Sequence, residues 1–169
     1  MDPLLILVDG YNVIRNVPGL AAAERVSMET GREALVQQVR MRFRHTPHRV
    51  VIVFDGANDT ESVLPVRRMP RGQIVFTRRD ETADSLIQRR AAAEKAAGGA
   101  VCVYSDDLEV RTGVRDLGGA TAGVAELAET LNAPDRRRRR LHLTRQYVRR
   151  QWGDEGAEKA QHMRGLRGS

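Results

Sequence analysis

The chain has 169 residues, of which 41% are hydrophobic and 30% are charged, and its formal net charge at pH 7 is +6. This length is about that of one domain, and the balance of apolar and charged residues fits a soluble globular protein rather than a disordered chain. The apolar run near the start, LLILV, is too short for a signal peptide or a membrane span, so we expect no membrane partner.

Four short runs rich in valine and isoleucine are predicted to be strands: residues 4–8, 50–54, 73–77 and 100–104. Each run is apolar throughout, which is typical of strands covered on both faces in a parallel sheet. The last run contains Cys102, the one cysteine, which can form neither an internal disulfide nor a CxxC zinc site. A cytoplasmic location is therefore the expectation.

Helical spacing of apolar residues lies between or after most of these strands. Thr30-Gly-Arg-Glu33 resembles a capping box, and Leu35, Val39 and Phe43 follow it at helical spacing. Later helices are predicted by the same periodicity, each ending at a glycine pair or before a proline, over residues 83–97, 110–117 and 124–131. This alternation predicts an α/β fold, a three-layer α/β/α domain with a mostly parallel central sheet, over residues 1–133.

Two stretches fall outside this alternation. Residues 56–72 contain turn formers, two prolines and the arginines Arg67, Arg68 and Arg71. A loop of this length in a compact domain is usually either functional or disordered, and we interpret its arginines as candidate RNA contacts. The second stretch is the C-terminal extension.

The extension, residues 134–169, is strongly basic. Residues 135–169 hold eleven basic and four acidic residues, a balance of +7, which leaves −1 on residues 1–134. We predict that the extension is part helical and part disordered and that it binds RNA, because arginine matches phosphate oxygens two at a time. Its densest run is Arg136, Arg137, Arg138, Arg139 and Arg140. A solubilising tail is the alternative.

Aspartates follow three of the predicted strands: Asp9, Asp55 and the pair Asp106-Asp107. The remaining strand leads through Arg78-Arg79 into DETADS, which places Asp84 in the first turn of a helix. Because the carboxyl ends of parallel strands share one edge of a sheet, we expect these acids to lie close together. Each acid singly has an alternative role as a turn or helix-capping residue.

Carboxylates gathered at one edge repel each other unless a cation neutralises them, and hard oxygen ligands suit Mg²⁺ or Mn²⁺. Such an ion favours phosphoryl chemistry, because it activates water and stabilises a leaving oxygen. Asn12 is a candidate to orient an aspartate or to contact a phosphate, and Ser105 to fix a ligand's rotamer from behind. The chain lacks a Walker motif and a GxGxxG sequence, which argues against nucleotide switching.

The segments LILVDGYNVI, VVIVFDG, VFT with ETADS, and VYSDD resemble, in this order, the YacP-like branch of the NYN-domain family, within the PIN-like nuclease superfamily. The resemblance covers residues 4 to about 131. It implies a PIN-like fold with a metal-dependent ribonuclease site. It also implies RNA partners, since YacP-like members include ribosome-associated endoribonucleases that cleave messenger RNA.

Matched by position, the resemblance places the family's acidic centre at Asp9, Asp84 and Asp106, with Asn12 beside it. Further candidates around this centre are Asp107 as a metal ligand and Asp55 and Glu81 as supporting acids. Our main hypothesis is an Mg²⁺- or Mn²⁺-dependent endoribonuclease whose substrate is guided by arginines, Arg78 and Arg79 among them. The alternative is a non-catalytic RNA- or ribosome-binding protein that acts through its basic tail.

Overall fold

The computed structural model describes residues 2–56 and 66–133, and the basic extension with its arginine run lies outside the described residues. Six strands form one sheet within this part of the chain. They are β1 (Leu4–Asp9), β2 (Arg49–Phe54), β3 (Val66–Met69), β4 (Gly72–Phe76), β5 (Ala100–Tyr104) and β6 (Ala120–Ala122). Their order is β3-β4-β2-β1-β5-β6, and every pairing is parallel except that of β3 with β4.

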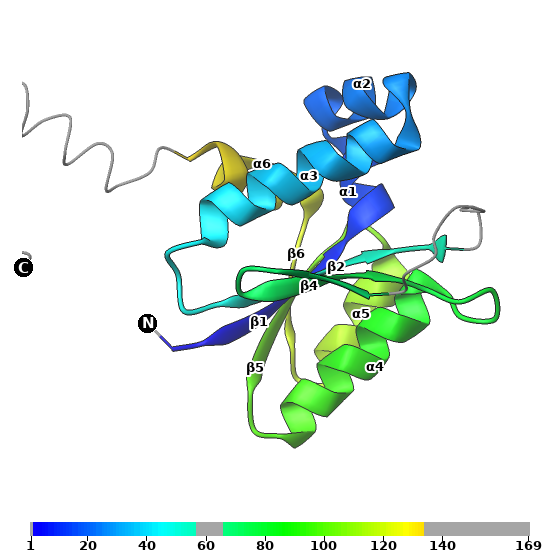
Figure 1. Ribbon diagram of the computed structural model, residues 1–169. Helices are drawn as coiled ribbons and strands as arrows, with labels where there is room; N and C mark the ends of the chain where they lie inside the picture. Colours follow the sequence, from blue (N-terminus) through cyan, green and yellow to red (C-terminus); the bar gives the residue numbers. More distant parts are fainter. Residues whose placement is uncertain (1, 57–65, 134–169) are drawn as a thin grey trace, which may run out of the picture. The chain divides into compact units, whose positions relative to one another are not determined.

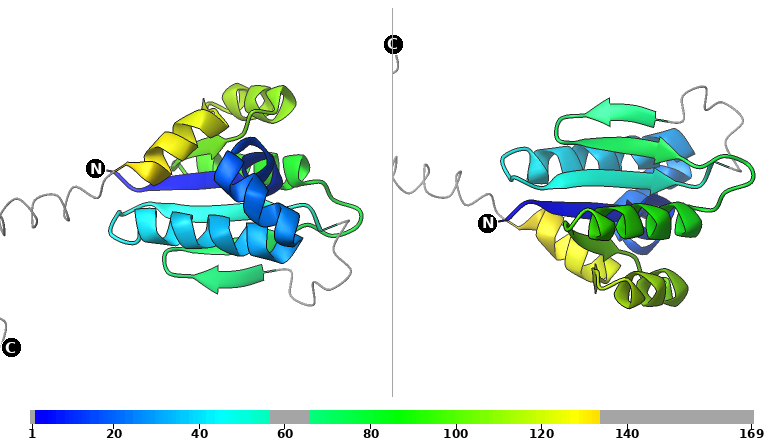
Figure 2. Two further views of the ribbon diagram at one scale, coloured as in Figure 1. Left: turned by 90° about the horizontal axis from the view of Figure 1, so that it is seen from above. Right: turned by 90° about the horizontal axis from the view of Figure 1, so that it is seen from below.

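Helices cover both faces of the sheet (Figures 1 and 2). They are α1 (Gly10–Asn16), α2 (Pro18–Val26), α3 (Met28–Phe43), α4 (Ala83–Ala96), α5 (Leu108–Asp116) and α6 (Val124–Asn132). Apolar residues of α1, α2, α3 and α6 pack on one face, and those of α4 and α5 pack on the other. The predicted three-layer α/β/α fold with a mostly parallel sheet is therefore confirmed.

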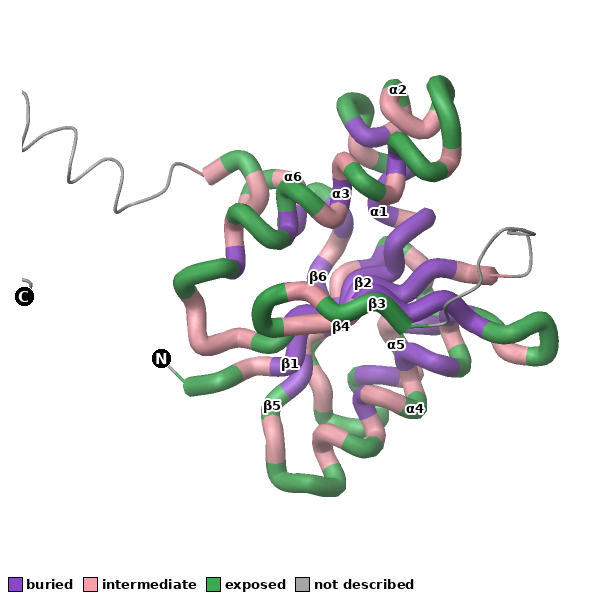
Figure 3. The backbone as a smooth tube through the Cα atoms, viewed as in Figure 1, coloured by how far each residue is buried: buried purple, intermediate pink, exposed green. Residues whose placement is uncertain are grey.

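The two apolar layers follow from the alternation of side chains along each strand. Ile6 and Val8 of β1 point into the layer with α3, whereas Leu5 and Leu7 point into the layer with α4. Because both faces are covered, the central strands are buried along almost their whole length (Figure 3). This is why they are apolar throughout rather than at alternate positions.

The structure adds elements where the sequence predicted none. Helices α1 and α2 fill the stretch between the first strand and the first predicted helix, and β6 follows α5. Strand β3 lies inside the stretch 56–72, so the prediction of a loop there is wrong for residues 66–69, while residues 57–65 lie outside the described residues. No helix among the described residues is long and apolar enough to cross a membrane.

The predicted capping box at the start of α3 is wrong by one turn. Helix α3 begins at Met28, and Ser27 is its N-cap residue, whose hydroxyl accepts a hydrogen bond from the Thr30 N–H at 3.0 Å. Thr30 therefore lies inside the first turn, where its N–H is one of the donors that a helix start leaves unpaired.

Candidate acidic site at the carboxyl edge of the sheet

Asp9 is the last residue of β1 and is buried, with 8% of its surface exposed. The chain turns directly into α1 through Gly10, where a Cβ atom would collide with the Phe54 ring, so this close approach requires glycine. The pKa of Asp9 is raised from 3.8 to about 6, chiefly by burial and to a smaller extent by the charges of Asp84 and Asp107. A hydrogen bond from Ser105 and the N–H of Asn12 act in the opposite direction.

Ser105 and Asn12 connect the end of β1 to the loop after β5. Ser105 is fully buried, and its hydroxyl donates to Asp9 Oδ2 at 2.9 Å and accepts from the Asp107 N–H at 3.0 Å. Asn12 Oδ1 accepts from the Asp106 N–H at 2.9 Å. Strands β1 and β5 are neighbours whose following helices lie on opposite faces of the sheet, and ligands of open α/β sheets bind at such a switch point.

Asp84 lies in the first turn of α4, as predicted, because Thr82 caps that helix by accepting from the Ser85 N–H. Its pKa is raised by partial burial first, and then by the negative charges of Asp107, Glu109 and Asp55. Every one of these causes raises the pKa. The carboxylates that approach this edge are thus destabilised by each other's charge.

The two consecutive aspartates after β5 have different surroundings. Asp107 is the N-cap of α5, where its Oδ1 accepts from the N–H groups of Glu109 and Val110, and its charge acts on both Asp9 and Asp84. Asp106 is exposed, and its Oδ1 accepts from the Val124 N–H at 2.8 Å, at the start of α6. One carboxylate oxygen of each residue is therefore occupied by N–H groups at the start of a helix.

The chemistry of these donors fits Mg²⁺ or Mn²⁺, since they are carboxylate oxygens whose mutual repulsion a hard divalent cation would relieve. Their present positions do not form a complete ligand set. Within residues 2–56 and 66–133, no group of three His, Cys, Asp or Glu side chains is placed to hold a metal ion. The assignment of Asp9, Asp84, Asp106 and Asp107 as ligands stays a prediction.

The supporting acids lie around this centre. Asp55 accepts from the Thr77 hydroxyl at 3.3 Å, and that hydroxyl also accepts from the Gly56 N–H, which ties the ends of β2 and β4 together. Glu81 forms an ion pair with Arg89 of α4 at 2.8 Å. The charge of Asp55 thus contributes to the raised pKa of Asp84, whereas the carboxylate of Glu81 is paired with Arg89.

The predicted RNA-contacting arginines of the domain are all exposed. Arg67 and Arg68 lie on β3, which is at the edge of the sheet, opposite Ile74 and Gln73 of β4. Arg78 and Arg79 lie in the segment between β4 and α4, directly before the acidic turn. The latter pair is therefore the one that the chain places next to Asp84.

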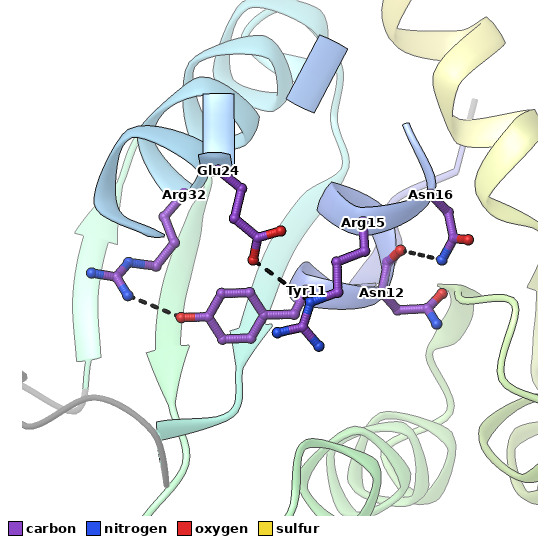
Figure 4. Close-up of polar contacts among 6 residues, drawn as sticks. All are labelled: Tyr11, Asn12, Arg15, Asn16, Glu24 and Arg32. Carbon is purple, nitrogen blue, oxygen red and sulfur yellow. Dashed lines mark hydrogen bonds and ion pairs between the residues drawn. The ribbon is translucent and has the colours of Figure 1, made fainter. Parts of the chain in front are cut away.

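Two further arginines flank Tyr11 at the same edge, and the sequence analysis missed them (Figure 4). Arg32 of α3 donates to the Tyr11 hydroxyl at 2.9 Å, and its guanidinium carbon lies 5.6 Å from the centre of the Phe76 ring. Arg15 lies over Tyr11, with its guanidinium carbon 5.3 Å from the ring centre, and pairs with Glu24 at 3.6 Å. Arg32 and Tyr11 are distant in the sequence, and only the packing of α1 against α3 brings them into contact.

The fold and this edge define a class: an α/β/α domain with a mostly parallel sheet and acids at its switch point. A profile of the YacP-like NYN domain family matches residues 6–165. The chain belongs to this family. The matched range corrects the expectation that the resemblance ends near residue 131, because it includes most of the basic extension.

Individual relatives agree with this assignment. An uncharacterised protein, YacP of Bacillus subtilis (strain 168), is 29% identical over 133 residues, which cover 79% of this chain and 78% of that protein. The crystal structure of Rae1 (YacP) from Bacillus subtilis has a TM-score of 0.67 and 25% identity and covers 99% of this chain and 93% of that one. A crystal structure of a mutant form of Rae1 gives the same TM-score and identity, with 92% and 89% covered.

Proposed function

We propose that this protein is an Mg²⁺- or Mn²⁺-dependent endoribonuclease whose metal is held by Asp9, Asp84 and Asp107, with Asp106 as a further ligand. When bound, the ion supplies activation of water and stabilisation of negative charge on the phosphodiester. The observation that carries the proposal is the uncompensated acidity of the switch point, where burial and neighbouring carboxylates raise the pKa of Asp9 to about 6. Perturbation of this kind is typical of functional sites.

The surrounding residues position these acids and the substrate. Ser105 and the N–H of Asn12 orient the carboxylate of Asp9, and the side chain of Asn12 fixes the loop that carries Asp106 and Asp107. Arginines at the same edge would hold the RNA backbone by paired hydrogen bonds to phosphate oxygens. They are Arg15, Arg32, Arg78 and Arg79.

We extend the proposal to ribosome-bound messenger RNA as the substrate in a cytoplasmic setting. Two features support this step: the membership in the YacP-like family and the +7 balance of residues 135–169, which suits a polyanion as large as ribosomal RNA. On this basis the acidic edge cuts, and the extension with Arg136–Arg140 holds the protein on its RNA partner.

The proposal is tested by cleavage of defined single-stranded RNAs by the full-length protein, with and without Mn²⁺. We expect Asp84→Asn to abolish metal-dependent cleavage and to leave the melting temperature in metal-free buffer unchanged or higher, because it removes a repelled charge. Asp80→Asn is the matched control, since Asp80 is an exposed acid in the turn just before α4, and it should cleave like the wild type. Full cleavage by a pure Asp84→Asn protein would overturn the proposal.

The alternative function is non-catalytic RNA or ribosome binding. The observation that favours it is the absence, among the described residues, of a metal-ready group of three ligands. On this alternative the aspartates serve as caps and turn residues, and neither Mn²⁺ nor Asp84→Asn changes any property of the RNA.

A further inference from the structure

A second site lies at the other end of the strands from the acidic edge. A cavity of about 370 Å³ opens there on the face covered by α4. Its floor is apolar and contains Leu5 of β1 and Val51 of β2. Its rim carries three arginines and one acid: Arg49, Arg71, Arg90 and Glu94. We call this cavity the arginine pocket. Because β2 runs from Arg49 to the acidic edge, about 20 Å separates the two ends.

The charges of this rim are only partly balanced. Arg49 donates to both carboxylate oxygens of Glu94 at 2.7 Å, so this arginine is held in place by a two-pronged ion pair. Arg71 and Arg90 form no ion pair within the described residues. Two positive charges are therefore left over in a cavity whose volume lies in the range of small-ligand sites.

The backbone conformation of Arg71 is a third, independent observation that points to a binding site at this cavity. Its φ is +59°, and Arg71 is the one non-glycine residue of the described chain with a positive φ. In the turn between β3 and β4, glycine would adopt this conformation without the steric cost that arginine meets. A strained arginine kept at the mouth of a cationic cavity indicates that its side chain is used there.

We propose that the arginine pocket binds a phosphate group, carried either by a free nucleotide or by an RNA chain. The planar guanidinium groups of Arg71 and Arg90 would hold phosphate oxygens by paired hydrogen bonds, and the apolar floor would contact a sugar or base. This site is separate from the proposed nuclease centre. A mononucleotide cannot span both sites, so binding at the arginine pocket can be tested independently of RNA cleavage.

The test is an NMR titration of the full-length protein in EDTA, read from the amide signals of Gly72 and Gln73, which line the pocket. A local readout is needed because the charge balance of +7 on residues 135–169 is expected to attract anions as well. The probes are inorganic phosphate, adenosine monophosphate, and one short RNA with a 5′-phosphate or a 5′-hydroxyl. If the shifts of these signals saturate with phosphate and with the monophosphate, the pocket is a nucleotide site. If they saturate only with the 5′-phosphorylated RNA, the pocket binds the end of an RNA chain.

Four variants make the test specific. Arg90→Gln and Arg71→Gly should each weaken binding about tenfold, and Arg71→Gly should also raise the melting temperature, because it relieves the strained backbone. Glu94→Gln should strengthen binding, since it frees Arg49 and removes the competing carboxylate. Arg89→Gln is the matched control and should change nothing at the pocket, because Arg89 neighbours Arg90 in α4 but pairs with Glu81.

Two results would overturn the proposal. One is that none of the probes shifts the Gly72 and Gln73 signals at millimolar concentration. The other is that Arg89→Gln weakens binding as much as Arg90→Gln does, which would indicate a general effect of positive charge. Loss of RNA cleavage in Asp84→Asn bears on the acidic edge alone and leaves this result unaffected.

Discussion

The properties of a single aspartate at the acidic edge depend on its burial and on the charges around it. Asp9 and Asp80 are both aspartates, but Asp9 is buried and is acted on by the charges of Asp84 and Asp107, whereas Asp80 is exposed. The sequence predicted that Asp9, Asp84 and Asp106 come from distant segments to one edge, whereas the charge that acts on Asp9 and Asp84 in the structure is that of Asp107. It predicted Ser105 as a donor to a ligand but did not show that its acceptor would be Asp9, or that Asp106 would turn towards α6, because both depend on loop geometry that has no local pattern.

The raised pKa of Asp9 predicts a pH-dependent stability in metal-free buffer. The group binds its proton in the folded state up to about pH 6 but only up to about pH 3.8 when unfolded. The free energy of unfolding therefore falls as the pH rises through this window, by on the order of 3 kcal/mol. Asp9→Asn removes this loss, and its amide oxygen can still accept from Ser105.

We therefore expect Asp9→Asn to match the wild type in stability near pH 4 and to exceed it by about 2–3 kcal/mol above pH 7, as measured by urea unfolding in EDTA. Asp80→Asn, which replaces an exposed carboxylate just before α4, is the control for the removal of one negative charge. A difference for Asp9→Asn that stays constant between pH 4 and pH 7.5 would contradict the buried, repelled carboxylate.

At the scale of elements, the sequence predicted what a local pattern can encode. The four apolar runs became β1, β2, β4 and β5 to within about one residue, because buried parallel strands leave a continuous apolar signal. Strand β3 has no such signal, since three of its four residues are exposed and it exists through antiparallel pairing with β4. Helices α1 and α2 have only seven and nine residues and are separated at Val17, so each is too short for a sustained periodic pattern in the sequence.

The starts of α5 and α6 give an element-scale prediction about Asp107 and Asp106. Each residue caps one helix, and asparagine is also a good capping residue, so replacement of either by asparagine should keep the fold. Because the charge of Asp107 acts on both Asp9 and Asp84, we expect Asp107→Asn to lower Mn²⁺-dependent RNA cleavage by more than tenfold and more than Asp106→Asn does. Equal losses in single-turnover assays would show that both residues hold the metal.

At the scale of the whole molecule, charge is divided unequally between two parts of the chain. Residues 1–134 carry a balance of −1 and include the acidic edge, and residues 135–169 carry +7. On the nuclease hypothesis, the acidic centre repels RNA before a metal is bound, and a basic segment in the same chain would offset this repulsion. This division predicts that affinity and cleavage can be separated by truncation.

Deleting residues 135–169 should weaken RNA binding and flatten its dependence on salt, because each lost phosphate contact lowers the slope by about 0.7 for a single strand. The nuclease hypothesis requires that the truncated protein still cleaves RNA at high concentration with Mn²⁺, since all the proposed metal ligands lie before residue 134. Near-ultraviolet circular dichroism must first show that it is folded. The binding-only alternative predicts no cleavage from the truncated or the full-length protein, so a folded truncation with Mn²⁺-dependent cleavage that Asp84→Asn abolishes would exclude it.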